Sequence, residues 1–181
     1  MKTITFITGN QNKADYLAKY IGIGIDHKKI DLEEIQSLDL KTIVEHKVRQ
    51  AYEVIKSPVL VEDASLEFCA FGRLPGPFIK YYLEEIPQQT ICNMLNGFDR
   101  KAIARTIYGY YDGDNVEYFE GRLEGAIATE PAGNGGYGWD RIFIPTGYNI
   151  TRASLNEVDN KITYLQIKPL EKIKQFLISV V

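Results

Sequence analysis

The order of apolar and polar residues predicts alternating strands and helices in the first third of the chain. Residues 3–8 alternate and are rich in β-branched side chains, which is typical of a strand. Residues 13–21 repeat their apolar positions with helical spacing, and residues 40–56 carry the clearest helical stripe. A second short strand is expected within residues 27–32, and the apolar run at residues 59–61 predicts a buried parallel strand. A strand, a turn with glycine and a helix at the start indicate an α/β fold.

The middle of the chain favours antiparallel structure. Residues 101–111 and 116–121 predict a hairpin around the turn at residues 112–115, and residues 122–129 extend the β region.

Shorter segments complete the pattern. Those expected are short helices at 78–86 and 90–95, a glycine-rich loop at 130–140, a last strand at 142–144 and a closing helix at 169–177 with Pro169 in its first turn. There is no internal repeat, low-complexity tract or linker. We therefore predict one α/β domain over residues 1–181, with two lobes that share a sheet.

Composition narrows the class of protein. A chain of 181 residues with 45% hydrophobic and 25% charged residues is typical of one globular domain. A net charge of −3 without a basic cluster argues against nucleic acid as a partner. Two cysteines are too few for a disulfide framework or a thiolate zinc site. No apolar run has the ~20 residues of a membrane span, and the first residues do not resemble a signal peptide, so a cytoplasmic protein with no membrane partner is expected.

The segment Thr8-Gly9-Asn10-Gln11-Asn12-Lys13 is the first candidate for chemistry. It places a hydroxyl, a glycine, two amides and a lysine where the first strand passes into the first helix. Backbone N–H groups and the dipole at a helix N-terminus suit an anion such as phosphate. The segment lacks the second glycine and the Lys-Ser/Thr pair of a Walker A loop. The same residues would also suit a turn in which asparagine caps the helix and Lys13 lies in solvent.

Lys47 is a second candidate because it interrupts the apolar stripe of the helix at residues 40–56. A charge in that position either extends its ammonium group to the rim or meets a partner. A phosphate would serve as that partner.

Two acidic pairs suggest a metal. Glu62-Asp63 is expected directly after the buried strand at 59–61, at the edge where open α/β sheets bind ligands, and Glu33-Glu34 lies in a loop. Carboxylates without histidine or cysteine nearby suit Mg²⁺, which usually takes one or two of them together with substrate phosphates. Adjacent carboxylates also repel, so one could act as a base. Alternatively, the aspartate caps the next element and the glutamate is solvated.

The glycine-rich loop matches G-x-G-x-x-G over residues 133–138 but has the wrong surroundings for a dinucleotide site. That fingerprint needs a strand before it and a helix after it, whereas Pro131 precedes this segment and a strand is expected to follow. Tyr137 and Trp139 beside closely approaching backbone would instead form a shelf on which a base could stack. Trp139 could equally serve as part of the core.

Together, these segments resemble the inosine triphosphate pyrophosphatase family. The matching stretches, in the family's order, are Thr8-Gly9-Asn10 with Lys13, Asp31-Leu32-Glu33-Glu34-Ile35-Gln36, Val61-Glu62-Asp63, Leu74-Pro75-Gly76-Pro77-Phe78-Ile79-Lys80 and Tyr137-Gly138-Trp139-Asp140. They span the chain from about residue 3 to residue 151. The resemblance implies an elongated α/β fold with a long mixed sheet flanked by helices, an active-site cleft between two lobes, and a homodimer.

The resemblance also implies a reaction and roles for residues. A noncanonical purine nucleoside triphosphate such as ITP, dITP or XTP would be hydrolysed to the monophosphate and pyrophosphate, with Mg²⁺. The triphosphate would be held by Thr8, Gly9, Asn10, Lys13 and Lys47. Glu34, Glu62 and Asp63 would surround the metal, with Asp63 orienting or deprotonating the attacking water and Lys13 and Glu34 assisting. The base would meet Tyr137, Gly138, Trp139, Asp140 and Tyr164.

The C-terminal part departs from the family's pattern. The family has Ser-His-Arg opening its last helix, whereas this chain has Thr163-Tyr164-Leu165. Tyr164 keeps a hydroxyl group, but Leu165 donates nothing to a purine edge, so base preference is expected to change. Two alternatives stay open: a catalytically inactive homologue that binds a nucleotide or a partner protein, and a pyrophosphatase for a different modified nucleotide.

Overall fold

A computed structural model describes residues 4–22 and 25–180. The strands are β1 Thr5–Ile7, β2 Asp26–Lys28, β3 Val59–Phe68, β4 Pro75–Gly76, β5 Lys101–Tyr111, β6 Val116–Ile127 and β7 Phe143–Pro145. The helices are α1 Gln11–Ile21, α2 Leu40–Ile55, α3 Ile79–Glu85, α4 Gln88–Asn93, α5 Glu157–Ile167 and α6 Leu170–Val180, with short 3₁₀ turns at η1 Cys69–Phe71 and η2 Arg152–Ser154. Thr3, the expected start of the first strand, lies outside the described residues.

The strands belong to one mixed sheet with the order β2-β1-β3-β5-β6-β7, and β4 pairs with β3 outside this path. β1 is parallel to both β2 and β3, whereas β4 is antiparallel to β3 and β7 antiparallel to β6. The predicted α/β class is therefore confirmed.

The chain divides into two compact units, and β3, β5 and β6 contribute residues to both. Unit 1 comprises residues up to Asp63, Ile107–Glu120 and the segment from Pro169; unit 2 comprises Ala64–Thr106 and Gly121–Lys168.

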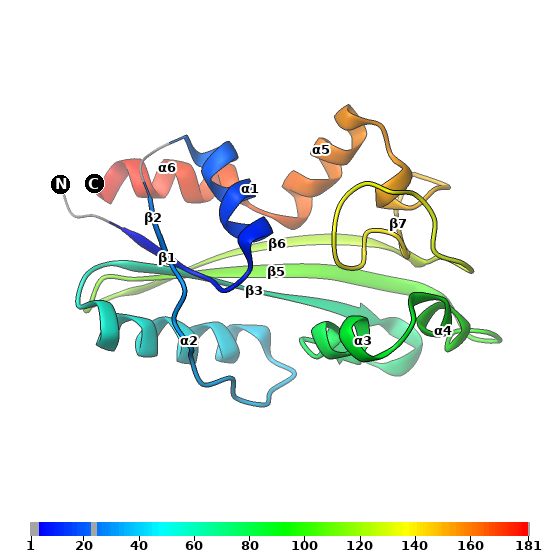
Figure 1. Ribbon diagram of the computed structural model, residues 1–181, viewed down its shortest axis with the longest axis horizontal. Helices are drawn as coiled ribbons and strands as arrows, with labels where there is room; N and C mark the ends of the chain where they lie inside the picture. The colour runs from blue at the N-terminus through cyan, green and yellow to red at the C-terminus, as the bar shows by residue number, and fades with distance from the viewer. Residues whose placement is uncertain (1–3, 23–24, 181) are drawn as a thin grey trace. The chain divides into compact units, whose positions relative to one another are not determined.

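Unit 1 is a sheet with helices on both faces. Figure 1 shows α2 on one face of its strands, and α1 and α6 on the other. The apolar stripe predicted for α2 forms a core with β1 and β3. The fully buried residues of this core include Val44, Val48 and Ala51 of α2 and Val59 of β3. On the other face, Phe176 of α6 packs edge-on against Tyr110 of β5, with ring centroids 5.0 Å apart. This core fixes β1, α2 and β3 relative to one another, and α2 and β3 carry Lys47, Glu62 and Asp63.

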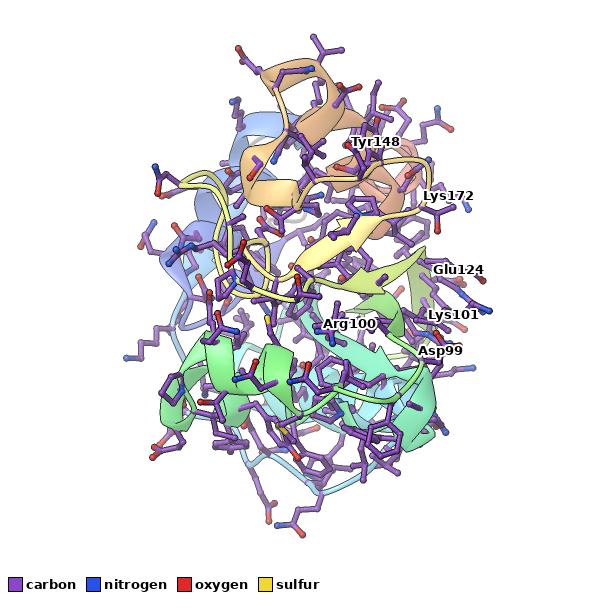
Figure 2. All side chains as sticks on the ribbon, turned by 90° about the vertical axis from the view of Figure 1, so that its right-hand side faces the viewer. Asp99, Arg100, Lys101, Glu124, Tyr148 and Lys172 are labelled. Atoms are coloured by element: carbon purple, nitrogen blue, oxygen red, sulfur yellow. The ribbon has the colours of Figure 1, made fainter. Side chains whose placement is uncertain are left out.

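Unit 2 has its own core. In Figure 1, α3 and α4 cover one face of its strands and α5 lies on the other. Its buried residues include Leu66, Phe68, Ile91, Leu95, Ile142 and Phe143. Arg100 (Figure 2) ties α4 to the sheet by donating from Nη2 to the carbonyl oxygen of Cys92 and from Nε to that of Ile127, both at 2.7 Å.

The predicted extent of the strand at residues 59–61 was wrong. β3 does not end at Val61 but continues to Phe68, so Glu62 and Asp63 lie inside the strand. The parallel register ends where Ile7 meets Val61, and β3 continues beyond it to pair with β4 through Leu66. The acidic pair therefore lies just past the end of β1.

Helix α5 was not predicted. Its apolar residues Val158, Ile162 and Leu165 are 68%, 49% and 37% exposed, whereas Tyr164 and Ile167 are buried, so its apolar residues do not gather on one face. Among the described residues, no helix has the length and apolar character required to cross a membrane.

Candidate functional site

The turn between β1 and α1 is held by its own polar side chains. The Asn10 side chain caps α1 by accepting from the backbone N–H of Lys13 at 3.4 Å, and the Thr8 hydroxyl oxygen accepts from the N–H of Asn10 at 3.1 Å. Asparagine therefore caps the helix, as the second interpretation expected. Lys13 does not lie in solvent, because its side chain is only 19% exposed.

Lys13 reaches from α1 to β3 and pairs with Glu62. Its Nζ lies 3.2 Å from Oε1 of Glu62, whose side chain is 1% exposed. Burial alone would lower the pKa of Lys13, but attraction to Glu62 and Asp63 outweighs burial and raises this pKa above 10.5. The ammonium group is therefore charged at neutral pH, and it neutralises a carboxylate that water does not reach.

Lys47 also meets partners. From α2, its Nζ donates to Oδ2 of Asp63 at 2.7 Å and to Oε1 of Glu34 at 2.9 Å. Burial alone would lower the pKa of Lys47, but the two carboxylates raise it above 10.5. One ammonium group thus draws together a strand residue and a loop residue that are 29 positions apart in the sequence.

Glu34, and not its neighbour Glu33, joins this group. The Glu33 side chain is 78% exposed, and its Oε2 lies 3.6 Å from Nε2 of His46. The Glu33 backbone is anchored on α2, because Gln50 accepts from its N–H at 3.1 Å and donates to its carbonyl oxygen at 3.2 Å. This anchor places the next residue beside Lys47.

We call Lys13, Lys47, Glu34, Glu62 and Asp63 the lysine–carboxylate cluster of unit 1. Its Asp63 and Glu34 carboxylates are 17% and 46% exposed, so a ligand can approach them from solvent. Within the described ranges, no three His, Cys, Asp or Glu side chains are arranged to hold a metal ion by themselves. The donor set instead suits a cation such as Mg²⁺ that takes one or two carboxylates and completes its shell with substrate and water.

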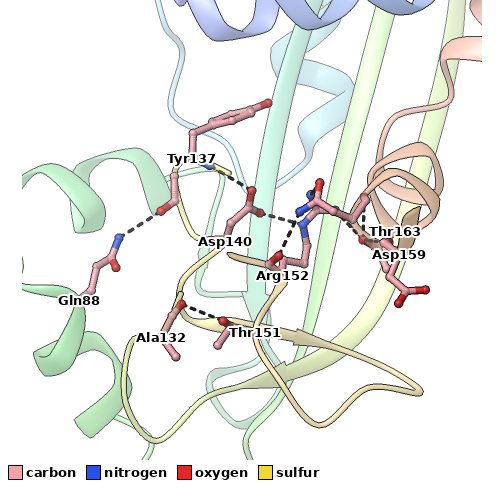
Figure 3. A network of polar contacts seen from close by, with 10 residues as sticks. Gln88, Ala132, Tyr137, Asp140, Thr151, Arg152, Asp159 and Thr163 are labelled. Carbon is pink, nitrogen blue, oxygen red and sulfur yellow. Dashed lines mark hydrogen bonds and ion pairs between the residues drawn. The ribbon is translucent and has the colours of Figure 1, made fainter. Parts of the chain in front are cut away.

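The glycine-rich loop of unit 2 is closed by Asp140. Oδ2 of Asp140 accepts from the backbone N–H of Tyr137 at 3.1 Å, and Gln88 of α4 donates to the carbonyl oxygen of Gly138 at 3.1 Å (Figure 3). Trp139 packs against the core of unit 2 and is partly buried, while Tyr137 is also half-buried. No helix follows the loop, since residues 139–142 form a turn before β7, which disfavours a dinucleotide fingerprint as expected.

Arg152 was missed by sequence reasoning. Arg152 is 2% exposed, and its Nε lies 2.9 Å from Oδ1 of Asp140. Tyr164 of α5 is also buried, with its ring 5.8 Å from the Arg152 guanidinium carbon. The sequence carries no local signal for this pair, because the partners are brought together only by the fold.

Gly136 makes the closed loop possible. Its φ of +70° favours glycine, and a Cβ at this position would collide with Oδ2 of Asp140. We expect Gly136→Ala to lower the free energy of unfolding by the ~1–2 kcal/mol of left-handed strain plus ~1–3 kcal/mol of overpacking. Urea unfolding measures this loss. Gly97→Ala is the matched control, because Gly97 has φ +83° but open space around it, and should show the strain alone. Equal losses in the two variants would contradict the collision.

Three comparisons relate the chain to known proteins. The sequence profile of the Ham1 family matches residues 4–176. The inosine triphosphate pyrophosphatase of Scheffersomyces stipitis is 36% identical, over 99% of this chain and 100% of its own length. Inosine triphosphate pyrophosphatase 2 of Trypanosoma cruzi is 40% identical, over 88% of this chain and 85% of its own. A HAM1 protein structure from Coxiella burnetii matches with a TM-score of 0.85 and 23% identity, over 99% of this chain and 100% of that one, which supports the fold.

Proposed function

Because this chain belongs to the Ham1 family, we propose that it hydrolyses noncanonical purine nucleoside triphosphates, such as ITP, dITP and XTP, to the monophosphate and pyrophosphate. Full-length relatives named inosine triphosphate pyrophosphatases, 36% and 37% identical, support this activity. The observation that carries the proposal is the lysine–carboxylate cluster, which assembles cations and carboxylates from α1, α2, β3 and a loop in unit 1.

The first requirement is to bind a polyphosphate of nearly four negative charges on a protein of net charge −3. Lys13 and Lys47 supply two fixed positive charges that their raised pKa values keep ionised throughout the neutral range. The N-terminus of α1, with Thr8, Gly9 and Asn10 before it, supplies backbone N–H groups and the positive end of the helix dipole. These groups would hold the triphosphate.

The second requirement is a base or an orienting group for water. Asp63 is the best placed, because it is partly exposed and Lys47 fixes its Oδ2 at 2.7 Å. Attack by water on the α-phosphorus needs positioning and charge neutralisation more than covalent chemistry. Glu62 is shielded from water and would support Lys13.

The third requirement is a cation for the charge that develops on the phosphates. The exposed parts of Asp63 and Glu34, with Glu62 behind them, would hold Mg²⁺ together with the substrate's own oxygens. Bound there, the ion would neutralise phosphate charge and polarise the bond that breaks.

Base recognition is proposed for unit 2. Tyr137 and Trp139, both partly buried, would form with Gly138 the shelf on which the base stacks, although Trp139 also packs against the core of unit 2. Asp140 and Tyr164 stay predicted base contacts; both are buried, which suits residues that shape a pocket. The homodimer, the cytoplasmic location and the single two-lobed domain also stay predictions.

The test measures products from a nucleotide panel. The purified chain is incubated with Mg²⁺ and ITP, dITP, XTP, ATP, GTP or a modified pyrimidine triphosphate, and monophosphate and pyrophosphate are quantified. We expect equal amounts of the two products, no diphosphate, and the fastest turnover with a noncanonical purine. Nucleotide binding without turnover would favour an inactive homologue, and turnover of a pyrimidine alone would favour a different substrate class.

A further inference from the structure

A guanidinium group is buried in unit 2, where protein acceptors bind each of its three nitrogens. Besides the bond from Nε to Asp140, Nη1 of Arg152 donates to the Thr163 hydroxyl at 3.1 Å, and Nη2 donates to Oδ1 of Asn160 at 3.4 Å (Figure 3). The Asn160 side chain returns a bond from Nδ2 to the carbonyl oxygen of Arg152 at 3.0 Å. Each of the three guanidinium nitrogens therefore has a protein acceptor, and the residue is only 2% exposed, so Arg152 contacts the interior of unit 2 and not solvent.

These contacts join three segments of the chain. Arg152 lies in η2, Asp140 ends the glycine-rich loop, and Thr163 and Asn160 belong to α5. The loop and η2 are also joined through backbone, because the N–H of Ala153 donates to the carbonyl oxygen of Asp140 at 2.9 Å and the N–H of Gly135 donates to the carbonyl oxygen of Ala153 at 3.0 Å. Arg152 is the charged centre of this junction.

Arg152 is linked to the turn that carries Tyr137 and Trp139 through the side chain of Asp140. One oxygen of Asp140 is held by Arg152, and the other accepts from the N–H of Tyr137 and closes the turn. Burying a carboxylate is costly unless it is paired and hydrogen-bonded, and Arg152 provides that pairing for Asp140. Without the guanidinium, the carboxylate would lose its orientation, and Tyr137 and Trp139 would lose the turn that places them.

We propose that Arg152 is a positioning residue that holds the turn at residues 137–140 and thereby sets base selectivity. The effect on selectivity rests on the proposed function, whereas the effect on the turn does not. The segment Thr163-Tyr164-Leu165 lacks the basic side chains expected there, and the structure brings a guanidinium to Thr163 from η2 instead. Base recognition in this chain would therefore depend on an indirectly acting arginine.

The chain offers a probe for this turn, because Trp139 is its single tryptophan. Trp139 fluorescence, with acrylamide quenching, is measured in the wild type, in Arg152→Lys and in Arg152→Met. We expect the emission of Arg152→Met to shift to longer wavelength and its quenching constant to rise at least ~2-fold, since a loosened turn exposes the indole. Arg152→Lys keeps the positive charge but loses the planar guanidinium with its several donors. Its emission wavelength and quenching constant should lie between those of the wild type and Arg152→Met.

Selectivity is measured in the same variants by kcat and KM for ITP, XTP and ATP, with inorganic tripolyphosphate as a substrate without a base. For Arg152→Met we expect KM for ITP to rise ~10-fold or more, about the loss of one good polar contact, while KM for tripolyphosphate stays at the wild-type value. Arg122→Met is the control, because Arg122 pairs with Glu124 on an exposed part of β6. It should change neither the fluorescence nor the KM values.

The outcomes separate the two proposals. Wild-type Trp139 fluorescence in both Arg152 variants would overturn the positioning role, whatever the enzyme hydrolyses. An altered fluorescence with equal KM changes for ITP and tripolyphosphate would overturn the role in base selectivity. If the wild type released no pyrophosphate from any nucleotide, the proposed function would fail, while the Trp139 fluorescence of the Arg152 variants would still decide the positioning role. Where Arg152→Met does not fold, Arg152→Lys carries both measurements.

Discussion

Replacing Asp63 with asparagine should lower kcat for pyrophosphate release by about 10²–10⁴-fold, the range expected when a general base is removed. The substitution is nearly isosteric, and the amide oxygen can still accept from Lys47, which also keeps Glu34 as a partner. The side chain is partly exposed, so no buried charge is left alone. The loss should therefore appear in kcat and not in stability.

The measurement is pyrophosphate release at saturating nucleotide and Mg²⁺, together with urea unfolding of the same preparation. Asp114→Asn is the matched control, because Asp114 is an exposed residue of the turn between β5 and β6 in the same unit. It should retain wild-type kcat. If Asp63→Asn kept wild-type kcat on every substrate, the proposed role of Asp63 would be wrong. If its KM rose while kcat was unchanged, Asp63 would be a binding residue only.

Much of unit 1 could be predicted from the sequence because its signals are local. A β-branched strand, an asparagine that caps the next helix, and the stripe of α2 each depend on neighbouring residues. The partners of Lys13 and Lys47 could not be predicted by spacing, since other basic residues such as Lys56 lie closer to Glu62 and Asp63 in the sequence. The resemblance grouped them, and the structure brings them within salt-bridge distance.

In unit 2 the same local signals were weaker. Helix α5 presents apolar residues to solvent, and its helical pattern was therefore not recognised. The glycine-rich loop was predicted as a loop, but what closes it was not, because Asp140, Arg152 and Thr163 come from three separate segments. Burial of an arginine is unusual in itself, and only a tertiary partner explains it. Such partners are visible only in the fold.

The pair of Lys13 and Glu62 should give the largest stability effect in unit 1. Lys13→Met removes the cation that pairs with the Glu62 carboxylate, which is 1% exposed, and breaking a buried ion pair by removing one partner costs about 3–5 kcal/mol. Urea unfolding at pH 7 measures the loss. Arg49→Met provides a matched control, since Arg49 pairs with Glu45 on the exposed side of α2, and such pairs contribute ~0.3–0.5 kcal/mol.

The pH dependence and a second substitution identify the cause. In the wild type the pKa of Lys13 is raised, so its contribution is fully present at pH 7 and is lost only as pH rises through that pKa. In Lys13→Met the buried Glu62 should instead take up a proton, so the difference in unfolding free energy between wild type and variant should shrink as pH falls from 7 towards 5. Adding Glu62→Gln removes the stranded charge and should restore most of the stability at pH 7, although not the activity, because the ammonium group proposed to hold the triphosphate is still missing. A deficit that is constant with pH and unchanged in the double variant would show that Lys13 stabilises unit 1 by the packing of its aliphatic stem, and that Glu62 does not depend on its charge.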